Sequence, residues 1–512
     1  MTTNAAPSPV DIAPASLRRP APAELSADQF RALGHDLVER IADFLASIGE
    51  RPVAPGESPR QVRAAFAATQ GLPGSGESPD ALLDEAARLL FAHSTFNGHP
   101  RFFGYITSSA APLGALADLL ASSVNPNVGA WALSPIASEI ERQTVRWLAE
   151  LIGFSTTCGG LLVSGGNMAN MVCCWAGLRA VAPWDVRKLG IAQGGRLVLY
   201  ASAETHTWLD KAADLAGLGT GAVRRVAMDD AGRMRADALA AAMDADRRAG
   251  LVPAFVVGTA GTVSTGVVDP LPAIADVCRQ AGAWFHVDGA YGAPAAALPD
   301  APADLAGIAL ADSVAVDPHK WLYAPVEAGC ALVRDPEKLR GAYSFTPPYY
   351  HFEGADDDPP VNFFEWGPQN SRGFRALKVW LGLRQMGREG VVQSVSEDCA
   401  LSRAMHAHVS AHPELEPYTQ ALSISTFRYV PRDLRGRADA EEYLNALNTE
   451  TLSVTQARGG LYLSNAVIAG RFLLRACIVN FRTTARDVAM VPGLVADVGR
   501  EVDARMRPAG SR

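Results

Sequence analysis

The chain has 512 residues, of which 48% are hydrophobic and 20% are charged, a composition that excludes an intrinsically disordered protein. Its 46 basic and 54 acidic residues leave a net charge of −8, which disfavours a general nucleic-acid binder and a protein that binds anionic membranes. The seven cysteines form no CxxC pair and are odd in number, which indicates thiols in a reducing compartment and predicts a cytoplasmic protein.

The N-terminal part of the chain has a helical pattern. Residues 1–24 are rich in alanine, proline and serine, and we predict a disordered tail there. From Ser26 onwards apolar residues recur every three or four positions, which predicts an amphipathic helix, and a second predicted helix covers residues 81–91. We expect residues 25–112 to form a helical segment that supports a homodimer, because the apolar stripe from Phe30 to Leu45 needs a partner surface.

Residues 113–385 show short apolar segments that alternate with helical patterns such as residues 272–281. The predicted strands are residues 196–201, 254–259, 283–288, 313–316 and 329–333. Strands that are apolar on both faces and alternate with helices are typical of an α/β protein with a mainly parallel sheet, whose ligands bind at the carboxyl ends of the strands. Residues 386–512 are predicted to form a smaller α+β domain.

One uncharged stretch, residues 151–178, is long enough to span a bilayer. It contains Gly159-Gly160 and the turn Ser164-Gly165-Gly166-Asn167, whose polar and backbone groups would lack hydrogen-bond partners in lipid. We therefore predict no membrane span.

Candidate catalytic residues lie at or after the ends of two predicted strands. One is followed by Asp317-Pro318-His319-Lys320-Trp321, and another ends in His286-Val287-Asp288, followed by the small residues Gly289 and Ala290. A lysine that can form a Schiff base and an aspartate that can pair with a pyridinium nitrogen are two groups that pyridoxal phosphate (PLP) requires. A surface lysine and a turn aspartate are the alternative interpretations of each motif taken alone.

A phosphate cradle is the third requirement of PLP. The motif Ser164-Gly165-Gly166-Asn167 runs from a predicted strand into a predicted helix. Glycines expose backbone N–H groups, and the helix N-terminus adds a partial positive charge. Together the three motifs predict a PLP site.

The ordered set of motifs resembles the group II PLP-dependent amino-acid decarboxylases, and the aromatic-L-amino-acid decarboxylases in particular. The motifs that carry the resemblance are His99-Pro100-Arg101-Phe102-Phe103-Gly104-Tyr105, Ser164–Asn167, His206, His286–Asp288, Asp317–Trp321 and Phe374-Arg375-Ala376-Leu377-Lys378. The resemblance covers roughly residues 25–505. It implies the aspartate-aminotransferase-like architecture of PLP fold-type I, and a homodimer with shared active sites.

The resemblance also implies roles for individual residues. Lys320 binds PLP covalently, Asp288 keeps the pyridine nitrogen protonated, and His206 stacks on the cofactor ring. The other expected cofactor residues are Gly165, Gly166, Asn167, Thr262, Ala290, Ser313 and His319. His319 is also expected to assist catalysis, and Tyr349 is expected to protonate the substrate α-carbon from a mobile loop. The neighbouring Tyr350 leaves the register of this acid open by one position.

The expected substrate-binding residues are Tyr105, Gly129, Trp131 and Ser371. Ser371 aligns with a position at which plant relatives carry serine for phenolic substrates and glycine for indolic ones, so we expect a tyrosine- or DOPA-like substrate. Four residues depart from the family pattern, and they are Asn167, Val263, Asp317 and Gly129, the last of which falls near a position where a bulky aromatic is common. Asp317 adds a carboxylate near the expected phosphate site.

The expected reaction is decarboxylation of an aromatic L-amino acid to the amine and CO2. The alternatives are an aldehyde synthase, which also deaminates its substrate oxidatively, and a decarboxylase of glutamate, diaminobutyrate or another non-aromatic amino acid. A nucleotide-binding α/β protein is disfavoured because the chain has no GxGxxG after its first strand and no Walker lysine pattern.

Overall fold

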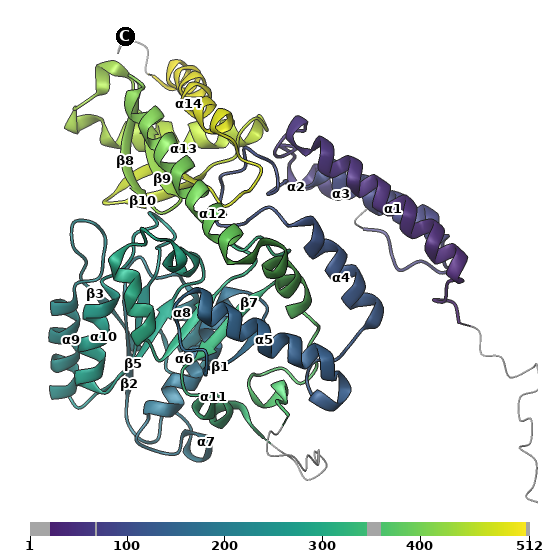
Figure 1. The fold of residues 1–512 in the computed structure, drawn as a ribbon. Helices are drawn as coiled ribbons and strands as arrows, with labels where there is room; N and C mark the ends of the chain where they lie inside the picture. Colours follow the sequence, from purple (N-terminus) through teal and green to yellow (C-terminus); the bar gives the residue numbers. More distant parts are fainter. Residues whose placement is uncertain (1–20, 67–68, 346–359, 508–512) are drawn as a thin grey trace, which may run out of the picture. The chain divides into compact units, whose positions relative to one another are not determined.

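A computed structural model describes residues 21–66, 69–345 and 360–507 (Figure 1). The chain divides into two compact units, one made of residues 1–50 and 57–94 and the other of residues 51–56 and 95–512. The helical segment predicted over residues 25–112 extends beyond the first unit, which ends at Ser94.

The first unit contains the helices α1 (Ala27–Ser47), α2 (Pro59–Ala65) and α3 (Pro79–His93). Ser26 begins α1 with a capping box, which confirms the predicted start of this helix. Within the unit, the Arg40 guanidinium pairs with the Asp84 carboxylate at 2.5 Å. No residue of α1 is buried, and Phe30 is 56% exposed. The predicted apolar stripe is therefore only partly covered, with Phe30 and Ile41 exposed and Leu33, Leu37 and Leu45 half-buried.

The larger unit is built around a seven-stranded sheet in the order β1-β7-β6-β5-β4-β2-β3. The strands are β1 (Gly159–Val163), β2 (Leu197–Ser202), β3 (Val223–Val226), β4 (Val252–Thr259), β5 (Trp284–Asp288), β6 (Ser313–Val316) and β7 (Gly329–Val333). β3, β2, β4, β5 and β6 pair in parallel, whereas β7 pairs antiparallel with both β6 and β1. The mainly parallel sheet predicted from the sequence is confirmed, with β7 alone running opposite to the other six strands.

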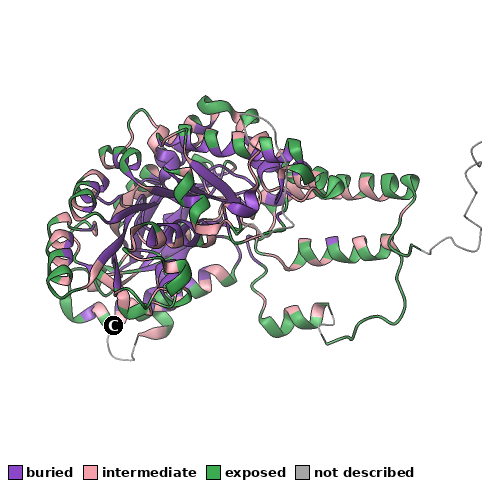
Figure 2. Cartoon of the chain, turned by 90° about the horizontal axis from the view of Figure 1, so that it is seen from below, coloured by how far each residue is buried: buried purple, intermediate pink, exposed green. Residues whose placement is uncertain are grey.

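Helices cover both faces of this sheet, as expected for strands that are apolar on both sides. One core contains residues of α5 (Pro135–Leu151), α9 (Ala236–Arg248) and α10 (Leu271–Ala281) together with Tyr200 of β2. The other contains residues of α6 (Gly166–Val181), α8 (Trp208–Leu215) and α11 (Pro336–Tyr343) together with Leu199. Figure 2 shows the strands as a buried centre surrounded by partly exposed helices. The short helix α7 (Val186–Leu189) follows α6.

A second sheet, entirely antiparallel, has the order β10-β11-β9-β8. Its strands are β8 (Leu415–Ala421), β9 (Ile424–Tyr429), β10 (Ser464–Ile468) and β11 (Arg471–Cys477). It packs with α12 (Ala376–Ala411), α13 (Glu441–Ala457) and α14 (Ala485–Met506), around a core that includes Phe427 and Leu474. This is the α+β arrangement predicted for the C-terminal region.

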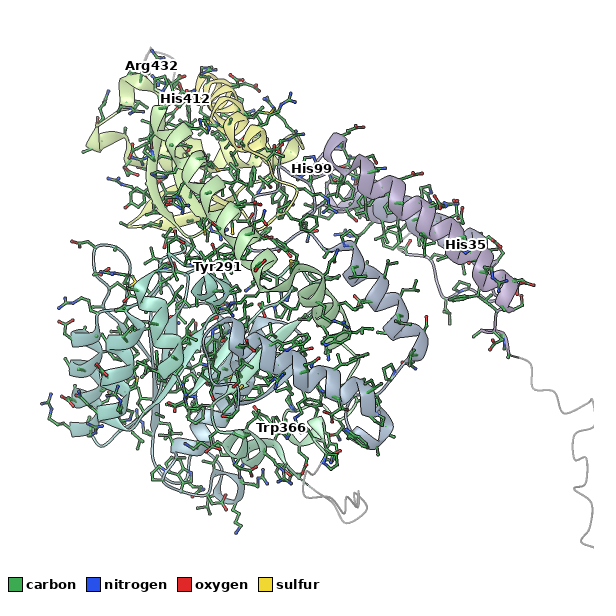
Figure 3. The ribbon with its side chains drawn as sticks, viewed as in Figure 1. His35, His99, Tyr291, Trp366, His412 and Arg432 are labelled. Carbon is green, nitrogen blue, oxygen red and sulfur yellow. The ribbon has the colours of Figure 1, made fainter. Side chains whose placement is uncertain are left out.

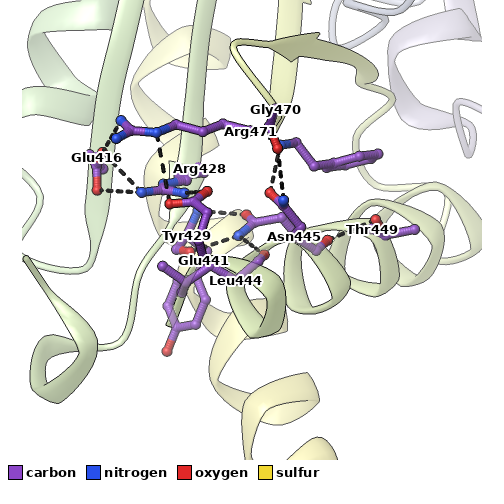
Figure 4. A network of polar contacts seen from close by, with 11 residues as sticks. Glu416, Arg428, Tyr429, Glu441, Leu444, Asn445, Thr449, Gly470 and Arg471 are labelled. Atoms are coloured by element: carbon purple, nitrogen blue, oxygen red, sulfur yellow. Dashed lines mark hydrogen bonds and ion pairs between the residues drawn. The ribbon is translucent and has the colours of Figure 1, made fainter. Parts of the chain in front are cut away.

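Ion pairs connect α13 to the second sheet (Figure 4). Arg428 of β9 pairs with Glu441 of α13 at 2.6 Å and with Glu416 of β8 at 3.3 Å. Arg471 approaches the same two carboxylates, at 3.7 Å from Glu416 and 3.8 Å from Glu441. The four side chains form one network that crosses from the sheet to the helix.

The long helix α12 connects the two sheets, because it packs against α5 beside the first and against β8 and β9 of the second. The domain boundary predicted after residue 385 lies inside this helix, next to Gly387, whose φ of 63° and ψ of 177° interrupt it. The helix α4 (Pro112–Val124) also packs against α12. In the described ranges, no helix is both long and apolar enough to cross a membrane.

Candidate active site

A cavity of about 380 Å³ lies where β4, β5 and β6 end and α6 begins. This is the edge at which ligands bind to parallel sheets. Eight of the residues predicted from the sequence line it, and they are Gly165, Gly166, Asn167, His206, Asp288, Ala290, His319 and Lys320. The fold thus brings together residues that are up to 155 positions apart in the chain, from Gly165 to Lys320.

Lys320 reaches the cavity from a tight turn after β6. Its backbone N–H donates to the Asp317 carbonyl at 2.9 Å, and its Nζ lies 3.0 Å from Asp317 Oδ2. The Asp317 side chain is 1% exposed, and among the described residues its Oδ1 has no hydrogen-bond partner. The lysine side chain remains 20% exposed, so its amino group is available to a molecule in the cavity.

Asp288 is the last residue of β5, and its carboxylate is held by two donors. Trp208 Nε1–H donates to Oδ2 at 2.8 Å, and the Ala290 backbone N–H donates to Oδ1 at 3.3 Å. The Trp208 side chain is completely buried, so the indole is itself fixed by the core. The carboxylate therefore presents a positioned negative charge to the cavity.

His206 lies at the rim of the same cavity, between β2 and α8. Desolvation by the surrounding protein lowers the pKa of its imidazole below the usual value, and the nearby Lys320 acts in the same direction. The Trp208 backbone N–H donates to Nδ1 at 3.2 Å. Both observations favour a neutral ring at neutral pH, which can lie against a flat ligand without a charge to be desolvated.

His286 lies one layer below the cavity, within β5. Its Nε2 is 2.7 Å from Asn170 Oδ1 and its Nδ1 is 2.8 Å from Ser313 Oγ. Because Asn170 Oδ1 can only accept, Nε2 carries the proton, and Nδ1 of the neutral ring accepts from the Ser313 hydroxyl, which itself accepts from Trp284 Nε1–H at 2.8 Å. Complete burial lowers the pKa of His286 to about 4, so the ring is neutral and ties three elements together below the cavity floor.

The glycine loop before α6 allows a close approach of backbone and side chains. Gly165 has φ +92°, a conformation that favours glycine, and a Cβ at Gly166 would lie 2.5 Å from Asp317 Oδ2. A Cβ at Gly329 would meet the backbone of Gly165 at 2.4 Å. The loop presents the N-terminus of a 16-residue helix to the cavity, where backbone N–H groups and the helix dipole favour an anion.

Two residues expected to bind the cofactor do not line this cavity. The Ser313 hydroxyl is fully buried and is occupied by Trp284 and His286, as described above. The Thr262 hydroxyl is also fully buried and lies 2.8 Å from Thr265 Oγ1, whereas the neighbouring Val263 lines the cavity. Direct contact of Ser313 or Thr262 with a cofactor therefore stays a prediction from the resemblance.

The residues expected to bind substrate lie outside the lining of this cavity in the described ranges of the single chain. Tyr105 is 60% exposed, and Trp131 donates its indole N–H to Glu139 at 2.9 Å. Gly129 packs against the segment that contains Ser371, because a Cβ at Gly129 would lie 2.1 Å from the Asn370 carbonyl oxygen. Gly129 and Ser371 thus come from adjacent segments, as a common substrate-binding surface requires.

The segment that contains Ser371 is anchored by a buried ion pair that the sequence did not reveal. Arg372 pairs with Glu141 of α5, with side-chain exposures of 1% and 0%. Arg372 also donates to the backbone carbonyls of Val128 at 2.9 Å and Leu162 at 2.7 Å. These contacts join α5, β1 and the loop that holds Gly129, so they set the position of the predicted substrate segment.

The cavity lining also includes polar residues that were not predicted from the sequence, among them Asn170, Glu204 and Thr259. Among the described residues, Glu204 Oε2 and Thr259 Oγ1 are buried without a hydrogen-bond partner. Asn170 lies four positions after Gly166 on α6, and this helical spacing places both on one face, a signal that could have identified it. The expected acid Tyr349 and its alternative Tyr350 lie outside the described residues.

Comparisons with known proteins agree with this geometry. A family model described as the pyridoxal-dependent decarboxylase conserved domain matches residues 59–429. An aromatic-L-amino-acid decarboxylase of Bacillus atrophaeus is 32% identical, over 94% of this chain and 97% of its own length. A tyrosine decarboxylase of Oryza sativa subsp. japonica is 34% identical, over 91% of this chain and 89% of its own length. A solved structure of Oryza sativa TDC with PLP and tryptamine superposes with a TM-score of 0.86 at 28% identity, and covers 93% of this chain and 99% of that chain.

Proposed function

The chain belongs to the pyridoxal-dependent decarboxylase family, and from this premise we propose that it converts an aromatic L-amino acid to the corresponding amine and CO2. The observation that carries the proposal is the placement of Lys320 and Asp288 at the ends of the adjacent parallel strands β6 and β5, on the wall of one cavity. The aromatic substrate class is supported by the relatives that act on aromatic amino acids.

The cavity residues fit PLP, which is the cofactor of this enzyme family. An amine, a fixed carboxylate and a glycine-bounded helix N-terminus are the three groups that the aldehyde, the ring nitrogen and the phosphate of PLP require. The glycine cradle has no room for side chains, since a Cβ at Gly166 would collide with Asp317. The unpartnered Thr259 hydroxyl and Glu204 carboxylate also offer polar groups to a bound molecule.

When bound, PLP supplies an electron sink that stabilises negative charge at the substrate α-carbon as CO2 leaves. Lys320 holds the cofactor covalently between turnovers, because its amino group lies in the cavity. Asp288 keeps a proton on the ring nitrogen, since a fixed anion stabilises the charged form of a neighbouring base. His206, whose pKa is lowered by burial, packs its neutral ring against the cofactor.

Proton delivery to the α-carbon decides whether the product is an amine or an aldehyde. An acid held over that carbon favours the amine, whereas attack by oxygen gives the aldehyde and ammonia. We assign the acid to Tyr349, on the resemblance of its motif to the catalytic loop of the family. A loop that closes over the substrate also excludes water from the reacting atoms.

We infer a phenolic substrate from Ser371. The Arg372–Glu141 ion pair holds the backbone next to Ser371, and the serine side chain itself is exposed. A hydroxyl on a fixed segment can hydrogen-bond a ring hydroxyl, and a site built for that bond discriminates against substrates that lack it. Tyrosine or DOPA is therefore the preferred substrate over tryptophan.

We also infer that the enzyme acts as a homodimer. Four apolar side chains of α4 are more than half exposed, and they are Leu116, Leu119, Leu120 and Val124. These side chains provide apolar surface of the kind that subunit interfaces bury, and Phe30 and Ile41 of α1 provide exposed apolar groups in the other unit. Sedimentation equilibrium of the purified protein tests this inference, and a monomer with full activity contradicts it.

A cytoplasmic location is consistent with the cysteines. All seven are free thiols, and six of them are buried. Proteins of oxidising compartments commonly pair such residues in disulfides, so the thiols favour a reducing compartment.

A substrate panel tests the proposed reaction directly. The purified enzyme, saturated with PLP, is incubated with tyrosine, DOPA, phenylalanine, tryptophan, glutamate and 2,4-diaminobutyrate. Amine, aldehyde, CO2 and consumed oxygen are measured for each. We expect amine and CO2 in equal amounts from a phenolic amino acid, without oxygen uptake. Consumption of one oxygen per turnover supports an aldehyde synthase, and faster turnover of glutamate or diaminobutyrate refutes the aromatic assignment.

A further inference from the structure

The residues that follow Lys320 are bound to a buried carboxylate on a distant helix. Trp321 Nε1–H donates to Asp398 Oδ2 at 2.8 Å, and the Tyr323 hydroxyl donates to the same oxygen at 2.7 Å. All three side chains are at most 2% exposed. Asp398 belongs to α12, 78 positions after Lys320 in the chain. One carboxylate oxygen thus holds the first and the third residue after the candidate cofactor lysine.

The backbone of this turn needs such an anchor. Tyr323 has φ +55°, a left-handed conformation that is unfavourable for a bulky side chain and persists where the surroundings enforce it. Its carbonyl accepts from the Ala111 backbone N–H at 2.8 Å, and its hydroxyl is held by Asp398. Side chain and backbone of Tyr323 are therefore both fixed, and the end of the lysine turn is fixed with them.

Packed aromatic rings connect Asp398 to the cavity wall. The Trp321 indole stacks on the Tyr291 ring, with a centroid distance of 4.9 Å and an angle of 14° between the planes. Tyr291 lines the cavity, and its hydroxyl lies 2.7 Å from Ser423 Oγ, in the turn between β8 and β9 (Figure 3). Asp398, Trp321 and Tyr291 form one packed column that runs from α12 to the candidate active site.

Asp398 also faces the segment after β11. The Asn480 backbone N–H stabilises its carboxylate, and the Asn480 side chain donates to the His99 carbonyl at 2.8 Å. Asp398 is therefore the point at which the lysine turn, α12 and the C-terminal sheet region meet. Burial raises the pKa of Asp398 to about 7, while the hydrogen bonds from Tyr323, Trp321 and the Asn480 N–H favour its ionised form. In that form the carboxylate is a stronger anchor than a neutral group, because hydrogen bonds to an ionised acceptor are about twice as strong.

We propose that Asp398 is a positioning residue that holds the Lys320 turn, through Trp321 and Tyr323, in the conformation that presents the lysine to PLP. The proposal rests on the proposed function, since it assumes that Lys320 is the lysine that binds PLP. Asp398 acts on catalysis only through the turn, because it does not line the cavity formed by the described residues. Loss of the carboxylate leaves the cavity residues of β4, β5 and α6 in place but loosens the turn that carries Lys320 and its neighbour His319.

The variant Asp398→Asn, assayed above pH 7 where the Asp398 carboxylate is mainly ionised, tests the proposal, because it keeps the shape of the side chain and removes its charge. We expect PLP to dissociate about tenfold more readily and kcat to fall about tenfold, the change that corresponds to one charge-assisted hydrogen bond. The KM for substrate stays within about twofold of the wild-type value, since no expected substrate contact is altered. The visible circular dichroism of bound PLP, which reports how the cofactor is held, falls in parallel.

The matched control is Asp246→Asn in α9. Asp246 also accepts from a tyrosine hydroxyl, that of Tyr200 at 2.8 Å, and it does not line the cavity. We expect this variant to lower thermal stability while it leaves PLP affinity, kcat and the circular dichroism of bound PLP unchanged. A purely structural role of Asp398 predicts the same behaviour for both variants, and that result overturns the proposal.

A second variant, Tyr323→Phe, removes one hydroxyl and keeps the ring, so it serves if Asp398→Asn fails to fold. It is expected to weaken PLP binding in the same direction, and the double variant is expected to show less than the sum of the two effects, because both act on one contact. Additive effects contradict the proposal. Borohydride reduction of the wild-type enzyme distinguishes failure of the proposed function from failure of the positioning role. If Lys320 carries no label after reduction, both the proposed function and the positioning role are refuted. If Lys320 is labelled but Asp398→Asn leaves PLP affinity and kcat unchanged, the positioning role alone is refuted.

Discussion

Replacement of Asp288 by asparagine removes one charge at the centre of the proposed mechanism and preserves the side-chain volume. The carboxylate is 7% exposed and accepts from Trp208 Nε1–H at 2.8 Å and from the Ala290 N–H at 3.3 Å. The asparagine oxygen can still accept from Trp208, so the side chain keeps its place. What is lost is the negative charge that holds a proton on the PLP ring nitrogen.

The expected fall in kcat follows from the free energy with which a neighbouring negative charge stabilises a protonated base. An opposite charge within contact distance shifts the pKa of its partner by about 1 to 3 units, which corresponds to about 1.4 to 4 kcal/mol. If this stabilisation is expressed in the transition state, kcat falls between about tenfold and about a thousandfold. We therefore expect Asp288→Asn to lower kcat about 100-fold, the middle of this range.

The assay measures amine release at saturating substrate and PLP, with cofactor occupancy checked by absorbance. Asp312→Asn is the matched control, because Asp312 Oδ2 accepts from the Phe285 N–H at 2.8 Å at the other end of the same strand and does not line the cavity. The control is expected to retain kcat. A fully occupied Asp288→Asn enzyme whose kcat lies within about threefold of wild type refutes the reasoning.

Three further predictions concern the reaction outcome, packing and pH. Tyr349→Phe should lower amine formation and raise aldehyde and peroxide, measured as product ratios, and the same switch in Tyr350→Phe instead would move the acid by one position. Gly129→Ala should lower the melting temperature and impair activity, because its Cβ would lie 2.1 Å from the Asn370 carbonyl oxygen, and unchanged melting would contradict this contact. Burial lowers the pKa of His286 from 6.5 to about 4, so the unfolded chain binds more protons between these values. The stability from the neutral ring is therefore present above about pH 6.5 and is lost as the pH falls towards 4, and His286→Gln should flatten this part of the pH–stability curve.

The central strands were predictable because both of their faces are buried. The five predicted segments correspond to β2, β4, β5, β6 and β7, with ends that differ by at most two residues. β3 was missed because it is an edge strand that carries Arg224 and Arg225, which interrupt an apolar pattern. The antiparallel direction of β7 could not be predicted, because an apolar segment has the same pattern in a parallel and in an antiparallel strand.

The candidate site was predictable where its residues stand in local motifs. The turns after β5, β6 and β1 each contain several functional residue types in sequence, and their common position follows from the parallel sheet. Contacts between distant single residues left no such signal. Arg372 and Glu141 are 231 positions apart, and Asp398 is 77 positions from Trp321. Only the folded chain shows that these distant residues meet in buried polar contacts.

We propose above all that Lys320 holds PLP in the cavity that it lines together with Asp288 and the N-terminus of α6. Borohydride reduction of the purified enzyme, followed by proteolysis and peptide mass spectrometry, tests it most directly. The account predicts a phosphopyridoxyl group on the peptide that contains Lys320, and none in a Lys320→Ala variant, which should also lose visible absorbance and turnover. Label on another lysine, or Lys320→Ala with wild-type turnover, would contradict the account.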